Sequence, residues 1–193
     1  MRIIAGSAKG KKIKALKSRS VRPLTDYARE ALFNILTPRI AGARFLDLFA
    51  GSGAVGIEAV SRGAREAVFV EKNPKCVALI RSNLAECGFK DRARVYTLSV
   101  SHSLNVFAQS GEKFDIIFNG APYGSPEFLL SLEKIGRDGL LEKGGLLIAE
   151  HHFKFEIDVA YPGLKKTRDQ RYGDTVLSFF EVTNENSGLS GQF

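Results

Sequence analysis

Short apolar runs alternate with amphipathic stretches along most of the chain. Six runs rich in β-branched and aromatic residues are RFLDLF (44–49), EAVFVE (66–71), ARVYTL (93–98), FDIIF (114–118), GLLIAE (145–150) and DTVLSFFEV (174–182). Windows with helical spacing lie between the first five, at 54–62, 74–87, 101–109 and 125–137. Buried strands that alternate with helices predict a parallel sheet covered on both faces. No evident helix separates the last two runs, so an antiparallel final hairpin is expected.

Two more elements precede this alternation. Residues 2–16 place short apolar-containing runs on either side of the turn GSAKG, which predicts a β-hairpin. Thr25 can cap a helix whose apolar positions repeat at three- and four-residue intervals, and Thr37-Pro38 is expected to end it. The polar segment 184–193 is expected to be a mobile tail. The predicted organisation is an N-terminal arm (1–24), one domain (25–183) and this tail.

Composition narrows the class of protein. The 193 residues, 44% hydrophobic and 25% charged, fit one soluble globular domain. No apolar run is long enough to cross a bilayer, and the basic N-terminal stretch lacks the apolar core of a secretory signal. Cys76 and Cys87 have no histidines nearby, so we expect two packed thiols in a reducing cytoplasm and no metal site.

Positive charge is concentrated in the first 22 residues. Eight of the 28 Lys and Arg residues lie there and no acid precedes Asp26, so the remainder holds 20 basic and 21 acidic residues. A cationic arm on a nearly neutral body indicates a polyanionic partner, most simply nucleic acid. A solubilising tail is the alternative interpretation.

A glycine-rich loop follows the first run of the alternation. Gly51, Gly53 and Gly56 have the spacing of a dinucleotide fingerprint, and Glu71 ends the next strand, where it can accept hydrogen bonds from two ribose hydroxyls. Both NAD and S-adenosylmethionine could use these features. Asp47 favours the second ligand, because a carboxylate there opposes a pyrophosphate but suits a sulfonium or an ammonium group.

These segments carry a resemblance to a known family. LDLFAGSGAVGIEAVSRGA followed by VFVEKN resembles the cofactor half of class I methyltransferases, and MRIIAG, RPLTDYAREALFNIL and RYGDTVLSFFEV resemble the ends of the bacterial RsmD type. The resemblance covers residues 1 to about 182. It implies a Rossmann-like α/β fold with a seven-stranded, mostly parallel sheet and an antiparallel last strand. It also implies methyl transfer from S-adenosylmethionine to N2 of a guanine in small-subunit (16S) ribosomal RNA.

The resemblance also implies roles for individual residues. Asp47 and the loop residues Phe49, Ala50, Gly51, Ser52 and Gly53 correspond to the part that holds the methionine portion of the cofactor. Glu71 corresponds to the ribose ligand, Lys72 and Asn73 to the adenine side, and the backbone near Ser99 and Val100 to a further adenine contact. Predicted RNA phosphate contacts are Lys9, Lys11, Lys12, Lys14, Arg22 and Arg29. The expected substrate is an assembling small subunit and the expected state a monomer in the cytoplasm.

The stretch FNGAPYG (118–124) departs from the family pattern, which is Asp or Asn, two prolines, and Tyr or Phe. An acceptor side chain there binds the N–H groups of the base amine and localises its lone pair, while the aromatic ring stacks on the base. Pro122 and Tyr123 match this pattern, whereas Gly120 replaces the acceptor. Asn119 is one residue early and points into the site only if the backbone bulges or turns there.

Three interpretations of this motif follow. Asn119 serves as the acceptor, backbone carbonyls near Gly120 and Ala121 carry a weakened reaction, or the protein binds without methylating efficiently. The predicted catalytic residues are accordingly Asn119, Pro122 and Tyr123. Rival functions are a catalytically silent RNA-binding or assembly factor, an amino-methyltransferase acting on DNA, and an NAD oxidoreductase.

Overall fold

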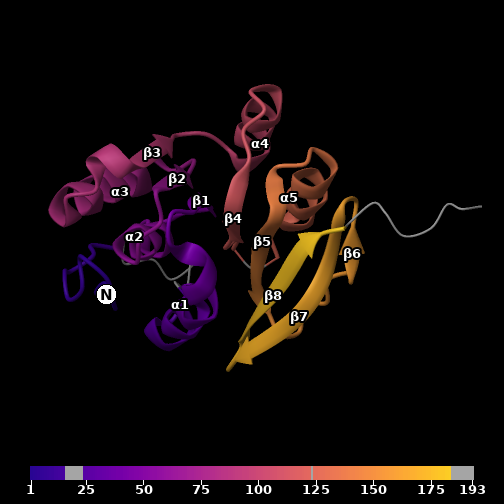
Figure 1. Cartoon of the computed structure of the whole chain (residues 1–193), viewed down its shortest axis with the longest axis horizontal. Coiled ribbons are helices and arrows are strands. Elements are labelled where there is room, and N and C mark those ends of the chain that lie inside the picture. The colour runs from indigo at the N-terminus through magenta and orange to yellow at the C-terminus, as the bar shows by residue number, and fades with distance from the viewer. Residues whose placement is uncertain (16–23, 123, 184–193) are drawn as a thin grey trace, which may run out of the picture.

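A single eight-stranded sheet organises the chain, and the computed structural model describes residues 1–15, 24–122 and 124–183 (Figure 1). The strand order is β3-β2-β1-β4-β5-β8-β7-β6. The strands are β1 (Arg44–Leu48), β2 (Glu66–Val70), β3 (Ala93–Tyr96), β4 (Phe114–Asn119), β5 (Leu141–His152), β6 (Ala160–Tyr161), β7 (Leu164–Tyr172) and β8 (Thr175–Val182). Strands β1 to β5 are parallel, and β8, β7 and β6 follow β5 in antiparallel pairs.

Helices cover both faces of the sheet, as the alternating pattern predicts. The helices are α1 (Asp26–Ile40), α2 (Ala54–Ser61), α3 (Pro74–Cys87), α4 (Val100–Gln109) and α5 (Pro126–Arg137), with a short 3₁₀ turn η1 (Lys90–Arg92). Helices α1, α2 and α3 share one apolar core with the sheet, and α4 and α5 share the core on the opposite face (Figure 1). Each predicted helical window therefore forms a helix within one residue of its expected bounds.

The sheet confirms the predicted fold class and corrects its strand count from seven to eight. The sequence LKKTRDQRY of β7 has neither an apolar run nor a clean alternation, because most of its side chains are exposed. Its partner β6 has only two residues. Backbone pairing with the apolar strand β8 holds β7 in the sheet, and hydrophobic patterning does not report that kind of support.

Helix α1 begins as predicted and ends later than predicted. The Thr25 hydroxyl accepts a hydrogen bond from the Ala28 amide at 3.2 Å, which caps the helix. Pro38 lies inside the last turn and the helix continues to Ile40. Proline costs one hydrogen bond there, but Ile40 is 4% exposed, so burial of the final residue favours one more turn of helix.

Residues 1–15 dock on the domain as a hairpin-like arm. Its two sides are joined by an antiparallel bridge between Arg2 and Lys12 and by the Ile3 amide, which donates to the Lys11 carbonyl at 3.0 Å. Ile3 and Ile13 are buried in the core that contains α1, α2 and α3. This arm is therefore packed on the domain and is not a free solubilising tail. The boundary between arm and domain at residue 24 stays a prediction.

A buried carboxylate on α2 fastens this arm. Glu58 is fully buried, and its two oxygens accept hydrogen bonds from the amides of Ile4 at 2.8 Å and Ala5 at 3.0 Å. The Arg62 guanidinium donates to the same carboxylate at 2.7 Å. One side chain thus satisfies two backbone groups of the arm and one partly buried cation.

Replacing Glu58 with alanine should loosen the arm. The change leaves two amides and the Arg62 guanidinium without their acceptor, which should cost about 3–5 kcal/mol of unfolding free energy. Denaturant unfolding measures that cost, and hydrogen exchange at residues 3–13 should speed up more than exchange in the sheet. Glu30→Ala, on the exposed side of α1, is the matched control and should cost less than about 0.5 kcal/mol. Unchanged exchange in the arm would contradict this role for Glu58.

Candidate functional site

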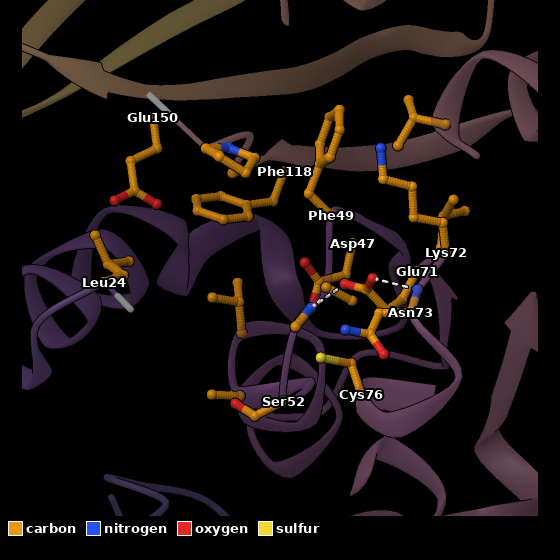
Figure 2. Close-up of a pocket in the computed structure, with 18 of the residues that line it drawn as sticks. Leu24, Asp47, Phe49, Ser52, Glu71, Lys72, Asn73, Cys76, Phe118 and Glu150 are labelled. Carbon is orange, nitrogen blue, oxygen red and sulfur yellow. Dashed lines mark hydrogen bonds between the residues drawn. The ribbon is translucent and has the colours of Figure 1, made fainter. Parts of the chain in front are cut away.

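A cavity of about 370 Å³ opens at the carboxyl ends of β1, β2, β4 and β5 (Figure 2). Strand β1 lies between β2 and β4, and the chain crosses to opposite faces of the sheet on its two sides. Ligands of open α/β sheets bind at this kind of topological switch point. The arm borders the same cavity, because Met1 and Ala15 are among its lining residues.

Asp47 is the buried acid of this cavity. Its side chain is 2% exposed, and Oδ2 accepts a hydrogen bond from the Gly56 amide at 2.9 Å. Desolvation by burial raises the pKa of Asp47 to about 8; the bond from Gly56 opposes this rise, and the carboxylates of Glu71 and Glu150 add to it. At neutral pH this carboxyl group is therefore largely protonated, and an incoming cation would favour its ionised form.

The loop after β1 uses backbone conformations that favour glycine, because Gly51 and Gly53 both have positive φ angles. Gly53 adopts a left-handed conformation (φ 77°) as the N-cap of α2. Phe49 also has a positive φ, 58°, which is a strained value for a bulky residue and places its ring at the cavity wall (Figure 2). At Gly56 a Cβ atom would lie 2.4 Å from the Phe69 ring, so only glycine lets α2 approach the sheet this closely.

Glu71 lies at the end of β2 beside this loop. Its Oε2 accepts a hydrogen bond from the Gly51 amide at 2.9 Å, and Oε1 accepts one from the Asn73 amide at 2.8 Å (Figure 2). A carboxylate has about four lone-pair sites, so each oxygen retains capacity for a hydroxyl donor. Lys72 and Asn73 also line the cavity, and the Asn73 side chain caps α3 through the Lys75 amide at 2.9 Å.

Of the two residues predicted near the adenine, Val100 lines the cavity and Ser99 is not among the lining residues. Val100 lines the cavity, together with Leu98. The Ser99 side chain caps α4, where its hydroxyl accepts a hydrogen bond from the His102 amide at 3.3 Å. The predicted contact at Ser99 is through the backbone and stays a prediction. The wall on this side is therefore apolar, which suits the face of a flat base more than its polar edge.

Asn119 does not point into the cavity, which corrects its predicted catalytic role. Strand β4 is regular at this position, where Asn119 pairs with Leu48 of β1 and Ala149 of β5. Its side chain lies on the opposite face of the sheet from Asp47 and is fully buried, and its amide donates to the Ser131 hydroxyl of α5 at 2.8 Å. Because no bulge interrupts the strand, the alternation of side chains carries the Asn119 amide away from the site.

Gly120 and Pro122 follow and do line the cavity. Gly120 therefore occupies the cavity side of the altered motif, but it brings no side chain. Tyr123, the predicted stacking residue, lies outside the described residues. The described part of the motif thus contributes backbone and a proline ring to the cavity.

Four of the predicted RNA contacts lie together on the arm. Lys9, Lys11, Lys12 and Lys14 are all exposed. The Lys11 ammonium donates to the Glu86 carbonyl at 2.8 Å, which places part of this surface against the end of α3. Arg22 lies outside the described residues.

Arg29 differs from the prediction that it contacts RNA. It is 1% exposed, its guanidinium donates to the Arg2 carbonyl at 2.6 Å, and it forms an ion pair with Asp26 at 3.2 Å. Burial lowers the pKa of Arg29, and the nearby carboxylates of Asp26 and Glu58 oppose this. Its position on an amphipathic helix at i+4 from Thr25 gives no sign of this burial, which depends on the docked arm.

Two further residues of the site, Asn83 and Glu150, are not among those predicted from the sequence. The Asn83 amide of α3 donates to the carbonyls of Lys14 and Ser52, each at 2.9 Å, and so links the arm to the glycine-rich loop. Glu150 of β5 lines the cavity and is 8% exposed. The only sequence signal for Glu150 was an acid at the carboxyl end of an apolar run, the same signal that identified Glu71.

The remaining candidates are structural. His151 is buried, and its Nε2 lies 2.9 Å from the Ser178 hydroxyl. Cys87 is buried in α3, as expected of a packed thiol, whereas Cys76 of the same helix is half-buried and lines the cavity. Within residues 1–15, 24–122 and 124–183 no cluster of His, Cys, Asp and Glu could hold a metal ion, and no helix there is long and apolar enough to span a membrane.

Known proteins resemble nearly the whole chain. The family model described as Conserved hypothetical protein 95 matches residues 1–181. The Bacillus subtilis protein YlbH, whose name gives it as a candidate rRNA methyltransferase, is 36% identical over 94% of this chain and 98% of its own length. Ribosomal RNA small subunit methyltransferase D of Escherichia coli K12 is 40% identical over 64% of this chain and 60% of its own length. The solved structure of a hypothetical protein from Thermus thermophilus matches with a TM-score of 0.82 and 36% identity, covering 94% of this chain and 99% of that one.

Proposed function

This chain belongs to the family described as Conserved hypothetical protein 95, and from that premise we propose that it is a cytoplasmic, S-adenosylmethionine-dependent rRNA methyltransferase. We propose further that it methylates the exocyclic N2 of a guanine in small-subunit RNA. One observation carries the proposal: the acids suited to the cofactor, Asp47 and Glu71, line the same cavity as Gly120 and Pro122 of the target-base motif.

The described residues fit this cofactor. S-adenosylmethionine, when bound, supplies a methyl group attached to a positively charged sulfur. Asp47 provides a buried carboxyl group whose ionised form a cation stabilises, and Glu71 keeps lone pairs free for two ribose hydroxyls. Lys72 and Asn73 flank the adenine side, and Leu98 and Val100 supply an apolar wall for the base. A pyrophosphate ligand such as NAD suits Asp47 poorly, because its negative charge would oppose the ionised form of this carboxyl group, which a cation favours.

The arm fits an RNA substrate. Its four exposed lysines give a surface that attracts phosphates without reading sequence. The arm also borders the cavity through Met1 and Ala15, so RNA held on the lysines lies near the site. Asn83 fixes the position of the arm relative to Ser52 of the glycine-rich loop. The proposed RNA-binding arm and the proposed cofactor loop are therefore joined through one residue.

The deciding experiment is methyl transfer to 30S subunits isolated from cells that lack this enzyme, with naked 16S RNA and duplex DNA as parallel acceptors. We expect transfer to the particle, and nuclease mapping should place the new methyl group on N2 of one guanine. Transfer to another base or atom would overturn the guanine-N2 assignment. A chain that binds S-adenosylmethionine and RNA but transfers nothing is a silent assembly factor, and preference for DNA would identify an amino-methyltransferase of DNA.

A further inference from the structure

One buried carboxylate in the cavity has no partner in the part of the chain that the structure describes. Glu150 lies near the end of β5 and is 8% exposed. None of the described residues donates a hydrogen bond to it or forms an ion pair with it. An unpaired buried carboxylate is costly, and sites of this kind concentrate where a ligand supplies the missing donor. Figure 2 shows the carboxylate directed into the cavity next to the Phe118 ring.

Glu150 lies where the altered motif lacks a side chain. Asn119 of β4 pairs with Ala149 of β5, so Gly120 and Glu150 are the next neighbours on the cavity face of the sheet. A Cβ atom built on Gly120 would lie 3.5 Å from Glu150 Oε2 and 2.7 Å from the Phe118 ring. The space that a side chain at position 120 would enter is therefore bordered by a carboxylate from the adjacent strand.

We propose that Glu150 binds the exocyclic amine of the target base, accepting its N–H hydrogen bond and then its proton, in place of the side chain that Gly120 lacks. This inference rests on the proposed function. Under this proposal Glu150 is a catalytic residue. It has the role that the sequence suggested for Asn119, whose amide faces α5 on the other side of the sheet.

The chemistry requires such a group. The lone pair of an aromatic amine is delocalised into the ring, and an acceptor for its N–H bond returns density to the nitrogen. The nitrogen–carbon bond forms as the carbon–sulfur bond of the donor breaks, and the sulfur keeps that electron pair. The nitrogen then carries one proton too many, which Glu150 receives and later passes to solvent. No other reactant is needed.

The ionisation of Glu150 suits this role. Burial raises its pKa to about 7, so the carboxylate and carboxylic acid forms are both populated near neutrality. A proton acceptor that titrates near the working pH both takes and releases protons readily. Among the described residues, the other titratable side chains that line this cavity are Asp47, Glu71, Lys72, Arg29, Cys76 and Glu127, which come from β1, the end of β2, α1, α3 and α5.

The test compares Glu150→Gln and Glu150→Ala with the wild-type chain in single-turnover methyl transfer at saturating cofactor. We expect Glu150→Ala to lose about 100- to 1,000-fold in rate, by analogy with removal of one preorganised hydrogen-bonding group. The wild-type rate should rise about tenfold from pH 5.5 to 7 and then level off, whereas Glu150→Gln should be slower and independent of pH. Glu142→Gln, an exposed position at the other end of β5, is the matched control and should behave as wild type.

Two measurements without turnover separate this role from others. Dissociation constants for S-adenosylhomocysteine and for RNA should change less than about threefold in both variants. Glu150→Gln should also be more stable than wild type at pH 8.5, because the raised pKa makes the buried carboxylate a cost that grows as pH rises through about 7. Loss of cofactor affinity with an unchanged rate at saturation would show that Glu150 holds the cofactor and would overturn the proposal.

The two levels of inference fail in different ways. If wild-type protein methylates RNA and Glu150→Gln keeps its rate and pH dependence, the role of Glu150 is wrong and the proposed function stands. If wild-type protein binds cofactor and RNA but transfers no methyl group, the proposed function is wrong and the catalytic role of Glu150 falls with it.

Discussion

Replacing Asp47 with asparagine should abolish tight binding of S-adenosylmethionine while making the unliganded chain more stable above pH 8. The amide keeps an oxygen that can accept the hydrogen bond from Gly56, so the loop after β1 should retain its shape. It removes the negative charge that faces a cationic ligand, and hydrogen bonds to charged groups contribute about 1.5–3 kcal/mol. We therefore expect the dissociation constant to rise by roughly a hundredfold, measured by calorimetry.

The pH dependence of binding tests the same carboxylate. In the unliganded chain burial raises the pKa of Asp47 to about 8, so below this pH the group must release a proton to face a cation. Between pH 6.0 and 7.5 the dissociation constant of the wild-type chain should fall by roughly twentyfold, and that of Asp47→Asn should stay constant. Asp91→Asn, on the exposed 3₁₀ turn, is the control and should follow wild type. Equal affinity of Asp47→Asn and wild type would refute the assignment.

The stability change has a definite sign. The ordinary pKa of Asp47 is 3.8 and the folded value is about 8. Between these values the folded chain holds a proton that the unfolded chain has released, so the unfolding free energy falls as pH rises. Asparagine removes this penalty, and the gain should reach roughly 2–5 kcal/mol at pH 9 and shrink toward pH 5. A site that weakens the empty protein in this way is more easily understood as a binding site than as part of the core.

Most elements and the cofactor side of the site can be predicted from the sequence, for physical reasons that differ between them. Buried parallel strands leave continuous apolar runs, and Asp47 and Glu71 stand out as acids at the ends of such runs. Strand β7 is not predicted by hydrophobic patterning, because it is charged and mostly exposed and is held by backbone pairing with β8. Pro38 was expected to end α1, but tertiary burial of Ile40 overrides that local signal.

The motif at the end of β4 shows that the sequence of one strand does not reveal which neighbouring side chains share the cavity with it. Alternation along β4 was enough to state that Asn119 faces away from Gly120 unless the backbone bulges, and the regular register shows that it does face away. The replacement, Glu150, comes from a different strand thirty residues later. Its place beside Gly120 depends on the register between β4 and β5, which no local pattern encodes. From the sequence, Arg29 is likewise expected to be a surface cation, but the docked arm covers it.

Replacing the four arm lysines, Lys9, Lys11, Lys12 and Lys14, with glutamine should reduce RNA affinity by about 10²- to 10⁴-fold at low salt. Each phosphate contact that is lost removes about 0.7–0.9 from the slope of log affinity against log salt, so the slope should fall by about 3. Filter binding or anisotropy across a salt series measures both quantities. Cofactor affinity should not change, because these side chains are exposed and do not line the cavity.

Substitution tests this surface more sharply than deletion of the arm. Deletion would remove Ile3 and Ile13 from the core and leave Glu58 buried without its amide donors, so any loss of activity could come from unfolding. A fourfold control removes the same charge from the amino ends of β2, β3, β4 and β5, at Arg65, Lys90, Lys113 and Lys143. If the control set weakens RNA binding as much as the arm set, net charge and not the arm determines affinity. If only the arm set does so, RNA is held on the side of the molecule where the arm borders the cavity, which is what methyl transfer to a base requires.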